Sequence, residues 1–170
     1  PYDRDLSKYK VVIAPVLYMV KPGFKESIEK FVSEGGTFIT TFFSGVVNED
    51  DKVFQGGYPG PLSDVLGLKV EEFEAMKHYV KNSIVLNGKL PNVLGEFESR
   101  LWCDILQLGT AESLAEYGSD FFKGSPALAV NNFGKGRAYY VATLPYNEFL
   151  RQFLRQVCAD QGIEPVIQAP

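Results

Sequence analysis

The sequence is poor in the residue types that most often build reactive and metal-binding sites. Its 170 residues include one histidine and two cysteines, and the cysteines, Cys103 and Cys158, lie far apart in no metal-binding spacing. One imidazole and two separated thiols do not supply a zinc ligand set, so we expect no metal and no cofactor. The cysteines are expected to be reduced, buried thiols, which favours a cytoplasmic location.

Basic clusters and long apolar runs are also absent. Lysine and arginine never cluster in more than a pair, and the net charge is −4 with a pI near 5.1, which argues against a nucleic-acid partner. No apolar run approaches the roughly 20 residues of a membrane helix, so no membrane partner is expected. The chain begins at Pro1 without an initiator methionine or a signal peptide, and we expect it to be part of a longer polypeptide.

The composition that is present, 45% hydrophobic and 14% aromatic residues, suits one compact domain with a full core. We expect that domain to cover residues 1–164. Residues 165–170 are expected to form a tail or a linker.

The N-terminal third has the pattern of a βαβ unit. Val11–Ala14 is an unbroken apolar run, which is typical of a strand covered on both faces of a parallel sheet. Pro22 suits the start of a helix, and apolar residues then recur at helical spacing until Gly35. Thr37–Phe43 is rich in β-branched and aromatic residues and predicts a second strand, parallel to the first. The pattern indicates an α/β fold with a mostly parallel sheet.

Later elements are less regular. Two alternating apolar runs within Ala127–Thr143, around a turn rich in asparagine and glycine, predict an added β-hairpin. Asn147–Gly162 has helical spacing, with Asn147 as a candidate cap. Between them and the βαβ unit, the sequence predicts a short helix (Leu62–Leu66), two short strands (Lys69–Phe73 and Ser83–Leu86) and an irregular connection (Leu90–Glu98).

The position to inspect for chemistry is the carboxyl end of the second strand, where α/β sheets bind ligands and can present a nucleophile. Here the turn carries Ser44, but the bulky Phe42 stands where such a turn needs a small residue. A stand-alone hydrolase or amidotransferase-like enzyme using Ser44 or Cys103 with His78 is one hypothesis. A loop serine bonded to local backbone is the favoured alternative for Ser44. A small-molecule sensor module without chemistry is a third hypothesis.

The segment Phe54–Pro61 is unusually rich in aromatic residues, glycine and proline. It is either a tight loop packed on its own domain or a contact surface for a partner, because rigid loops with aromatic residues are typical anchors of interfaces. With the preceding turn it gives the candidate interface residues Phe43, Ser44, Val46, Val47, Phe54, Tyr58 and Pro59.

Several segments together resemble the middle domain of glycoside hydrolase family 42 β-galactosidases. They are Asp5–Met19, Glu34–Glu49, Gly56–Leu62 and Phe133–Tyr140. The resemblance implies a homotrimerisation domain with a flavodoxin-like three-layer sandwich, as in class I glutamine amidotransferases. It also implies a first βα element, which would precede Asp5 and is missing here.

The resemblance further implies that the domain follows a catalytic (β/α)8 barrel and has lost the amidotransferase nucleophile, with Phe43 and Ser44 where that fold carries a cysteine. Both catalytic glutamates of the family belong to the barrel. We therefore assign no catalytic residue to this chain, and we expect it to be inactive alone, with its own barrel and two further copies as partners.

Overall fold

The computed structural model describes residues 5–164. The expected tail at 165–170 lies outside the described residues. In chain order the elements are β1 (Val11–Ala14), α1 (Phe24–Ser33), β2 (Thr37–Thr41), a 3₁₀ turn (Gly60–Leu62), α2 (Ser63–Leu66), β3 (Leu68–Ala75), β4 (Lys81–Leu86), β5 (Glu96–Leu108), β6 (Glu112–Tyr117), β7 (Pro126–Phe133), β8 (Gly136–Val141), β9 (Thr143–Pro145) and α3 (Asn147–Asp160).

The predicted βαβ unit is present. β1 and β2 pair in parallel, with Val11 opposite Thr37, and α1 packs its buried apolar face against β2 and β8. The chain leaves the helix before Gly36, where a Cβ atom would overlap the ring of Phe31. Glycine at this position therefore lets the helix lie close to the strand that follows it.

The described strands form one sheet in the order β1-β2-β8-β7-β6-β4-β5-β3, with β9 paired to β5. β1, β2 and β8 run parallel, and the remaining pairings are antiparallel. The expected mostly parallel sheet is thus correct for these three strands and wrong beyond them. The cause is connection length, because tight turns such as the one that places Phe133 opposite Gly136 link only antiparallel neighbours.

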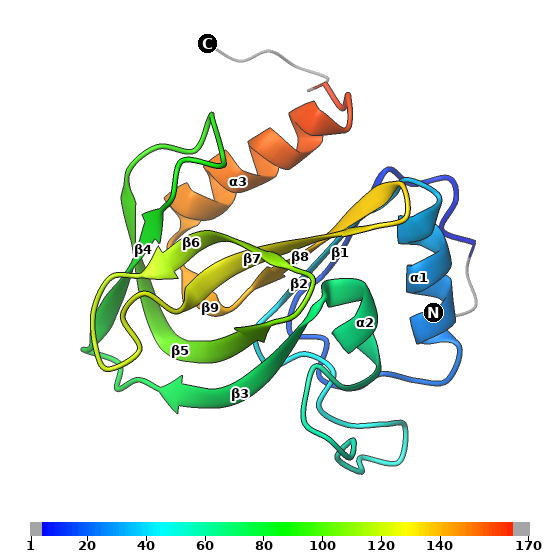
Figure 1. Cartoon of the computed structure of the whole chain (residues 1–170), viewed down its shortest axis with the longest axis horizontal. Coiled ribbons are helices and arrows are strands. Elements are labelled where there is room, and N and C mark those ends of the chain that lie inside the picture. The colour runs from blue at the N-terminus through cyan, green and yellow to red at the C-terminus, as the bar shows by residue number, and fades with distance from the viewer. Residues whose placement is uncertain (1–4, 165–170) are drawn as a thin grey trace.

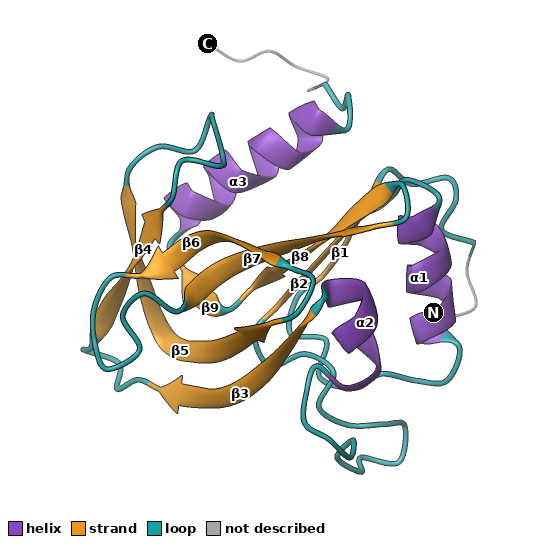
Figure 2. Ribbon diagram, in the orientation of Figure 1, coloured by secondary structure: helices purple, strands orange, loops and turns teal. Residues whose placement is uncertain are grey.

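Helices cover both faces of the sheet (Figures 1 and 2). On β8, the ring of Tyr139 packs on Phe153 of α3, with centroids 5.3 Å apart. The preceding residue, Ala138, pairs with Asn131 of β7, and the Asn131 amide donates to the Val65 carbonyl of α2 at 3.0 Å. Because neighbouring residues of a strand point to opposite faces, α3 and α2 lie on opposite sides of the sheet.

Three strands escaped prediction: β5, β6 and β9. The expected connection Leu90–Glu98 is wrong at its end, since β5 already begins at Glu96. Within β5, Leu101 has a φ of 66° and the register against β9 shifts there. Such a bulge interrupts the alternation of apolar and polar residues, so the sequence does not show the period expected of a strand.

Two element ends also differ from expectation. The second strand ends at Thr41 instead of Phe43, because the chain turns sharply after it. The cap predicted at Asn147 is wrong: Tyr146 holds the N-cap position, and no side chain caps the helix. The N–H of Tyr146 donates to the Glu98 carbonyl at 3.1 Å, so contact with β5 fixes where α3 begins.

Candidate functional site

The turn after β2 lies at the position where α/β folds place reactive groups. Phe43 occupies it with a φ of 57°, in the left-handed region that residues with large side chains avoid. Its backbone N–H donates to Asp104 Oδ2 at 3.2 Å. A sharp elbow is therefore present, but it carries a benzyl group instead of a nucleophile.

Ser44 follows the elbow and is completely buried. Its Oγ donates to the Thr41 carbonyl at 2.6 Å, accepts from the Leu17 N–H at 2.9 Å, and lies 2.8 Å from Thr40 Oγ1. These contacts use the hydrogen-bonding capacity of the hydroxyl within the chain. Ser44 thus has the local structural role considered from the sequence.

The other groups of the hydrolase hypothesis lie elsewhere. His78 is exposed on the turn between β3 and β4, with its ring edge-on to Tyr79 at 5.2 Å. Cys103 is buried in β5, and burial raises the pKa of its thiol. No hydrogen bond in the described part of the chain joins His78 to Ser44 or to Cys103. The geometry does not support nucleophilic catalysis by these residues.

A buried carboxylate supports the elbow. Asp104 is fully buried in β5; its Oδ1 accepts from Trp102 Nε1 at 2.7 Å and from the Tyr58 hydroxyl at 3.1 Å. Its Oδ2 accepts from the Tyr140 hydroxyl at 2.6 Å and from the Phe43 N–H at 3.2 Å. Burial raises the pKa of Asp104, and the four donors oppose that rise. Asp104 and its four donors form a unit that we call the Asp104 cluster. It joins β5 and β8 to the elbow and to the loop that carries Tyr58.

Four aromatic rings adjoin the cluster and form a row. The centroid of Tyr18 lies 5.3 Å from that of Phe43, which lies 4.9 Å from Trp102. Trp102 in turn stacks on Phe73 at 4.5 Å with an interplanar angle of 13°. Phe73 is 45% exposed and Tyr18 37%. These four residues, the aromatic row, present an apolar surface built from segments far apart in the sequence.

The Phe54–Pro61 segment is packed on its own domain. The Tyr58 carbonyl accepts from the Val70 N–H at 2.8 Å. A Cβ atom on Gly45 would lie 2.1 Å from the Pro59 carbonyl oxygen, and one on Gly60 would lie 2.6 Å from the Gly45 oxygen. The two loops therefore touch backbone to backbone, which only glycine permits.

The seven candidate interface residues differ in exposure. Three are buried within the chain, namely Ser44, Val47 and Pro59, and four are partly exposed, namely Phe43, Val46, Phe54 and Tyr58. In this conformation the partly exposed side chains are the ones available for direct contact. Their role in an interface stays a prediction.

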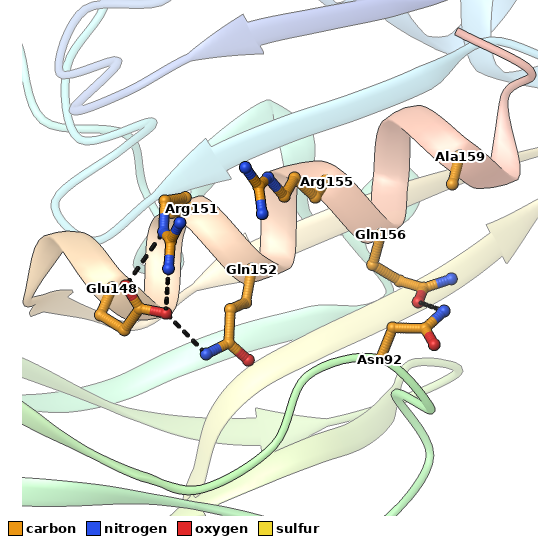
Figure 3. A pocket seen from close by; sticks show the side chains of 7 residues that line it. All are labelled: Asn92, Glu148, Arg151, Gln152, Arg155, Gln156 and Ala159. Carbon is orange, nitrogen blue, oxygen red and sulfur yellow. Dashed lines mark hydrogen bonds and ion pairs between the residues drawn. The ribbon is translucent and has the colours of Figure 1, made fainter. Parts of the chain in front are cut away.

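A polar pocket of about 470 Å³ lies between α3 and the segment before β5 (Figure 3). Glu148 accepts from Arg151 at 2.8 Å and from Gln152 at 2.8 Å. Asn92 donates to Gln156 at 2.6 Å. Most of these side chains bond to one another along the helix, so the pocket shows no convergent set of groups for a ligand.

A second pocket, of about 270 Å³, lies between the outer strands and α3 and is lined mainly by apolar side chains. Ile13 and Ile39 contribute to it from the strands, and Leu150 and Phe153 from the helix. Ile13 is 49% exposed. The pocket therefore adjoins the outer edge of β1.

Within residues 5–164, no group of three or more histidine, cysteine, aspartate or glutamate side chains is placed to hold a metal ion. No helix in the described part of the chain is long and apolar enough to cross a membrane.

Sequence reasoning missed Asp104 and three members of the aromatic row, Tyr18, Phe73 and Trp102. One signal was available: Asp104 lies between Cys103 and Ile105 in an apolar stretch, and a buried acid needs hydrogen-bond partners. The row itself has no sequence signal, because its members meet only through the pairing of distant segments.

Comparison with known proteins gives one consistent family. Residues 1–164 match the family model described as the β-galactosidase trimerisation domain. The chain is 54% identical over 168 residues to the β-galactosidase BgaA of Planococcus sp. (strain 'SOS Orange'), covering 99% of this chain and 25% of that protein. It is 50% identical over 167 residues to the β-galactosidase Pbg of Clostridium perfringens, covering 98% of this chain and 24% of that protein.

A solved structure agrees with these matches. The crystal structure of β-galactosidase from Bacillus circulans sp. alkalophilus is similar with a TM-score of 0.97 at 50% identity, covering 99% of this chain and 25% of that chain. The chain thus spans about a quarter of the length of the relatives that it matches.

Proposed function

Since this chain belongs to the β-galactosidase trimerisation domain family of glycoside hydrolase family 42, we propose that it is the non-catalytic domain that holds three subunits of a β-galactosidase together. The enzyme would hydrolyse terminal β-D-galactosides through a barrel domain absent from this chain. The domain would also help to frame the entrance to the active sites. The match of residues 1–164 to the family model is the observation that carries this proposal.

The elbow after β2 supports a non-catalytic role. Phe43 stands at its apex, and Ser44 is buried with its hydroxyl bonded to neighbouring groups. A turn that presents no nucleophile has lost the catalytic use of this fold position. Its strained backbone is kept, held by Asp104, which suits a role in shaping a surface.

The flavodoxin-like sandwich with a missing first βα element is part of the proposal. β1 pairs with β2 on one edge, no other strand in residues 5–164 pairs with it, and Ile13 beside the apolar pocket is half exposed. A strand from a preceding segment, added in parallel to β1, would cover this edge and the pocket. Unpaired edges otherwise invite association with other chains.

A cytoplasmic location also belongs to the proposal. Both cysteines are free thiols, with Cys103 buried and Cys158 partly buried. Thiols without disulfide partners are typical of reducing compartments.

The test compares the full-length enzyme that carries this chain with the same enzyme lacking residues 1–164. Size-exclusion chromatography with light scattering is expected to show a trimer for the first and a smaller assembly for the second. This chain alone is expected to have no activity on terminal β-D-galactosides. A monomeric full-length enzyme, or galactosidase activity of the chain by itself, would contradict the proposal.

The predicted interface loops have their own test. Phe54→Glu in the full-length enzyme replaces a partly exposed ring by a charged side chain and is expected to weaken the trimer. Leu94→Glu, at a side chain that is 73% exposed beside α3, serves as the control. A trimer that survives Phe54→Glu unchanged would remove this loop from the interface.

A further inference from the structure

The aromatic row is an exposed apolar surface that the described part of the chain leaves uncovered at both ends. Phe73 at one end is 45% exposed and Tyr18 at the other is 37% exposed, although each ring already contacts a neighbouring ring. Exposed clusters of large aromatic side chains are characteristic of the centres of protein interfaces. Single exposed apolar residues are ordinary, whereas a row of contacting aromatic rings is not.

The row is also rigid before any partner binds. The Trp102 ring is fixed by the bond from its Nε1 to Asp104, and the bond from the Phe43 N–H to the same carboxylate holds the backbone of Phe43, whose ring lies 4.9 Å from that of Trp102. Because the cluster fixes the Trp102 ring and the backbone of Phe43, less conformational freedom remains to be lost at these two residues on association. Preorganised aromatic anchors of this kind contribute most to the affinity of an interface.

We infer that the aromatic row is the centre of the contact with a second copy of the polypeptide that carries this chain, an inference that rests on the proposed function. A trimer with threefold symmetry forms through head-to-tail contacts, so the row of one copy meets a different surface of the next. Glu72 and Glu74, the neighbours of Phe73 along β3, point to the opposite face of the strand and leave the row free of their charges. The complementary surface is therefore expected to be apolar where it meets the row.

This inference goes beyond the seven residues predicted from the loops. Of the row, only Phe43 belongs to that set, and the side chains with the largest exposure, Phe73 and Tyr18, come from β3 and from the segment after β1. The loop that carries Tyr58 then acts through Asp104 as support for the row.

The experiment replaces Phe73 by glutamate in the full-length enzyme. Tyr79→Glu is the matched control, because Tyr79 is an aromatic residue with 67% exposure outside the row. Light scattering over a dilution series is expected to show trimer association at least about 30-fold weaker for Phe73→Glu. The control is expected to stay as trimeric as the wild type. Circular dichroism checks that each variant is folded.

Tyr18→Glu, at the other end of the row, gives an independent variant if Phe73→Glu fails to fold. A folded row variant that remains trimeric overturns the inference, and so does equal dissociation of the Tyr79 control. Lower thermal stability with an intact trimer would assign the row to a neighbouring domain of the same copy, which also overturns it. A monomeric wild type would instead refute the proposed function, so the two failures are distinguishable.

Discussion

Replacing Asp104 by asparagine tests whether this carboxylate is the support of the site. Two of its four donors, the Trp102 indole N–H on Oδ1 and the Phe43 backbone N–H on Oδ2, cannot act as acceptors. They bind different oxygens. Whichever way an asparagine amide is turned, one of them therefore faces an NH2 group. The hydroxyls of Tyr58 and Tyr140 can rotate to accept, so they adapt.

The magnitude follows from these contacts. A buried N–H without an acceptor costs about 1–3 kcal/mol, and the remaining bonds lose the strength that a charged acceptor gives, about 1 kcal/mol. Release from the cost of burying a charge offsets part of this loss. We expect Asp104→Asn to lower the free energy of unfolding by about 2–4 kcal/mol at pH 7.

Urea denaturation of this chain measures the effect, and its fluorescence reports on the site directly. Trp102 is the single tryptophan of the sequence, and its N–H is bonded to Asp104, so native emission is expected to change in the variant. Asp64→Asn is the control, since Asp64 pairs with Lys25 at the surface with a 73% exposed side chain, where ion pairs contribute little. Asp104→Asn behaving like this control, with unchanged emission, would refute the reasoning.

Three further predictions concern the loops, the thiols and pH. In urea denaturation, Gly45→Ala is expected to lower the free energy of unfolding by more than about 2 kcal/mol and Gly56→Ala by about 1 kcal/mol. The reason is that a Cβ atom at Gly45 meets the backbone of another loop, whereas one at Gly56 meets nothing within 4 Å. Equal losses would contradict the close loop contact. In the native chain a thiol reagent is expected to label Cys158 quickly and Cys103 only after unfolding, since Cys103 is buried with a raised pKa; rapid labelling of both would show that β5 opens. Burial raises the pKa of Asp104 above its ordinary value of 3.8, so its stabilising contribution is complete below about pH 4 and falls as pH rises through the folded-state pKa. The stability difference between wild type and Asp104→Asn is then expected to be largest in acid, and a difference that grows with pH would reverse the assigned direction.

Local sequence patterns predicted the elements that depend on local physics. The apolar run Val11–Ala14, the helical spacing before Gly35 and the turn within Ala127–Thr143 gave β1, α1 and the β7–β8 hairpin. Each pattern is set by the period of one element against one buried face. The long strand β5 was missed, because the bulge at Leu101 interrupts that period.

At the candidate site, too, the sequence predicted local features and missed contacts between distant segments. The sequence favoured a structural role for Ser44 after β2, and the structure places Phe43 at the apex of the turn with Ser44 buried. It also indicated unusual packing in the Phe54–Pro61 segment, but not that Tyr58 extends to Asp104. A carboxylate far along the chain as a shared acceptor has no local signature.

By itself, the sequence determined the α/β class and the local elements of the N-terminal third, because residue types and short-range periodicity decide both. Only the tertiary structure decided that most of the sheet is antiparallel and that four aromatic rings, from Tyr18 to Phe73, come into contact in a row. The physical reason is that these features arise from strand pairing and from one buried charge, Asp104, which needs donors from several distant segments. Strand partners and hydrogen-bond donors of this kind come from residues far apart in the sequence, so short-range patterns do not predict them.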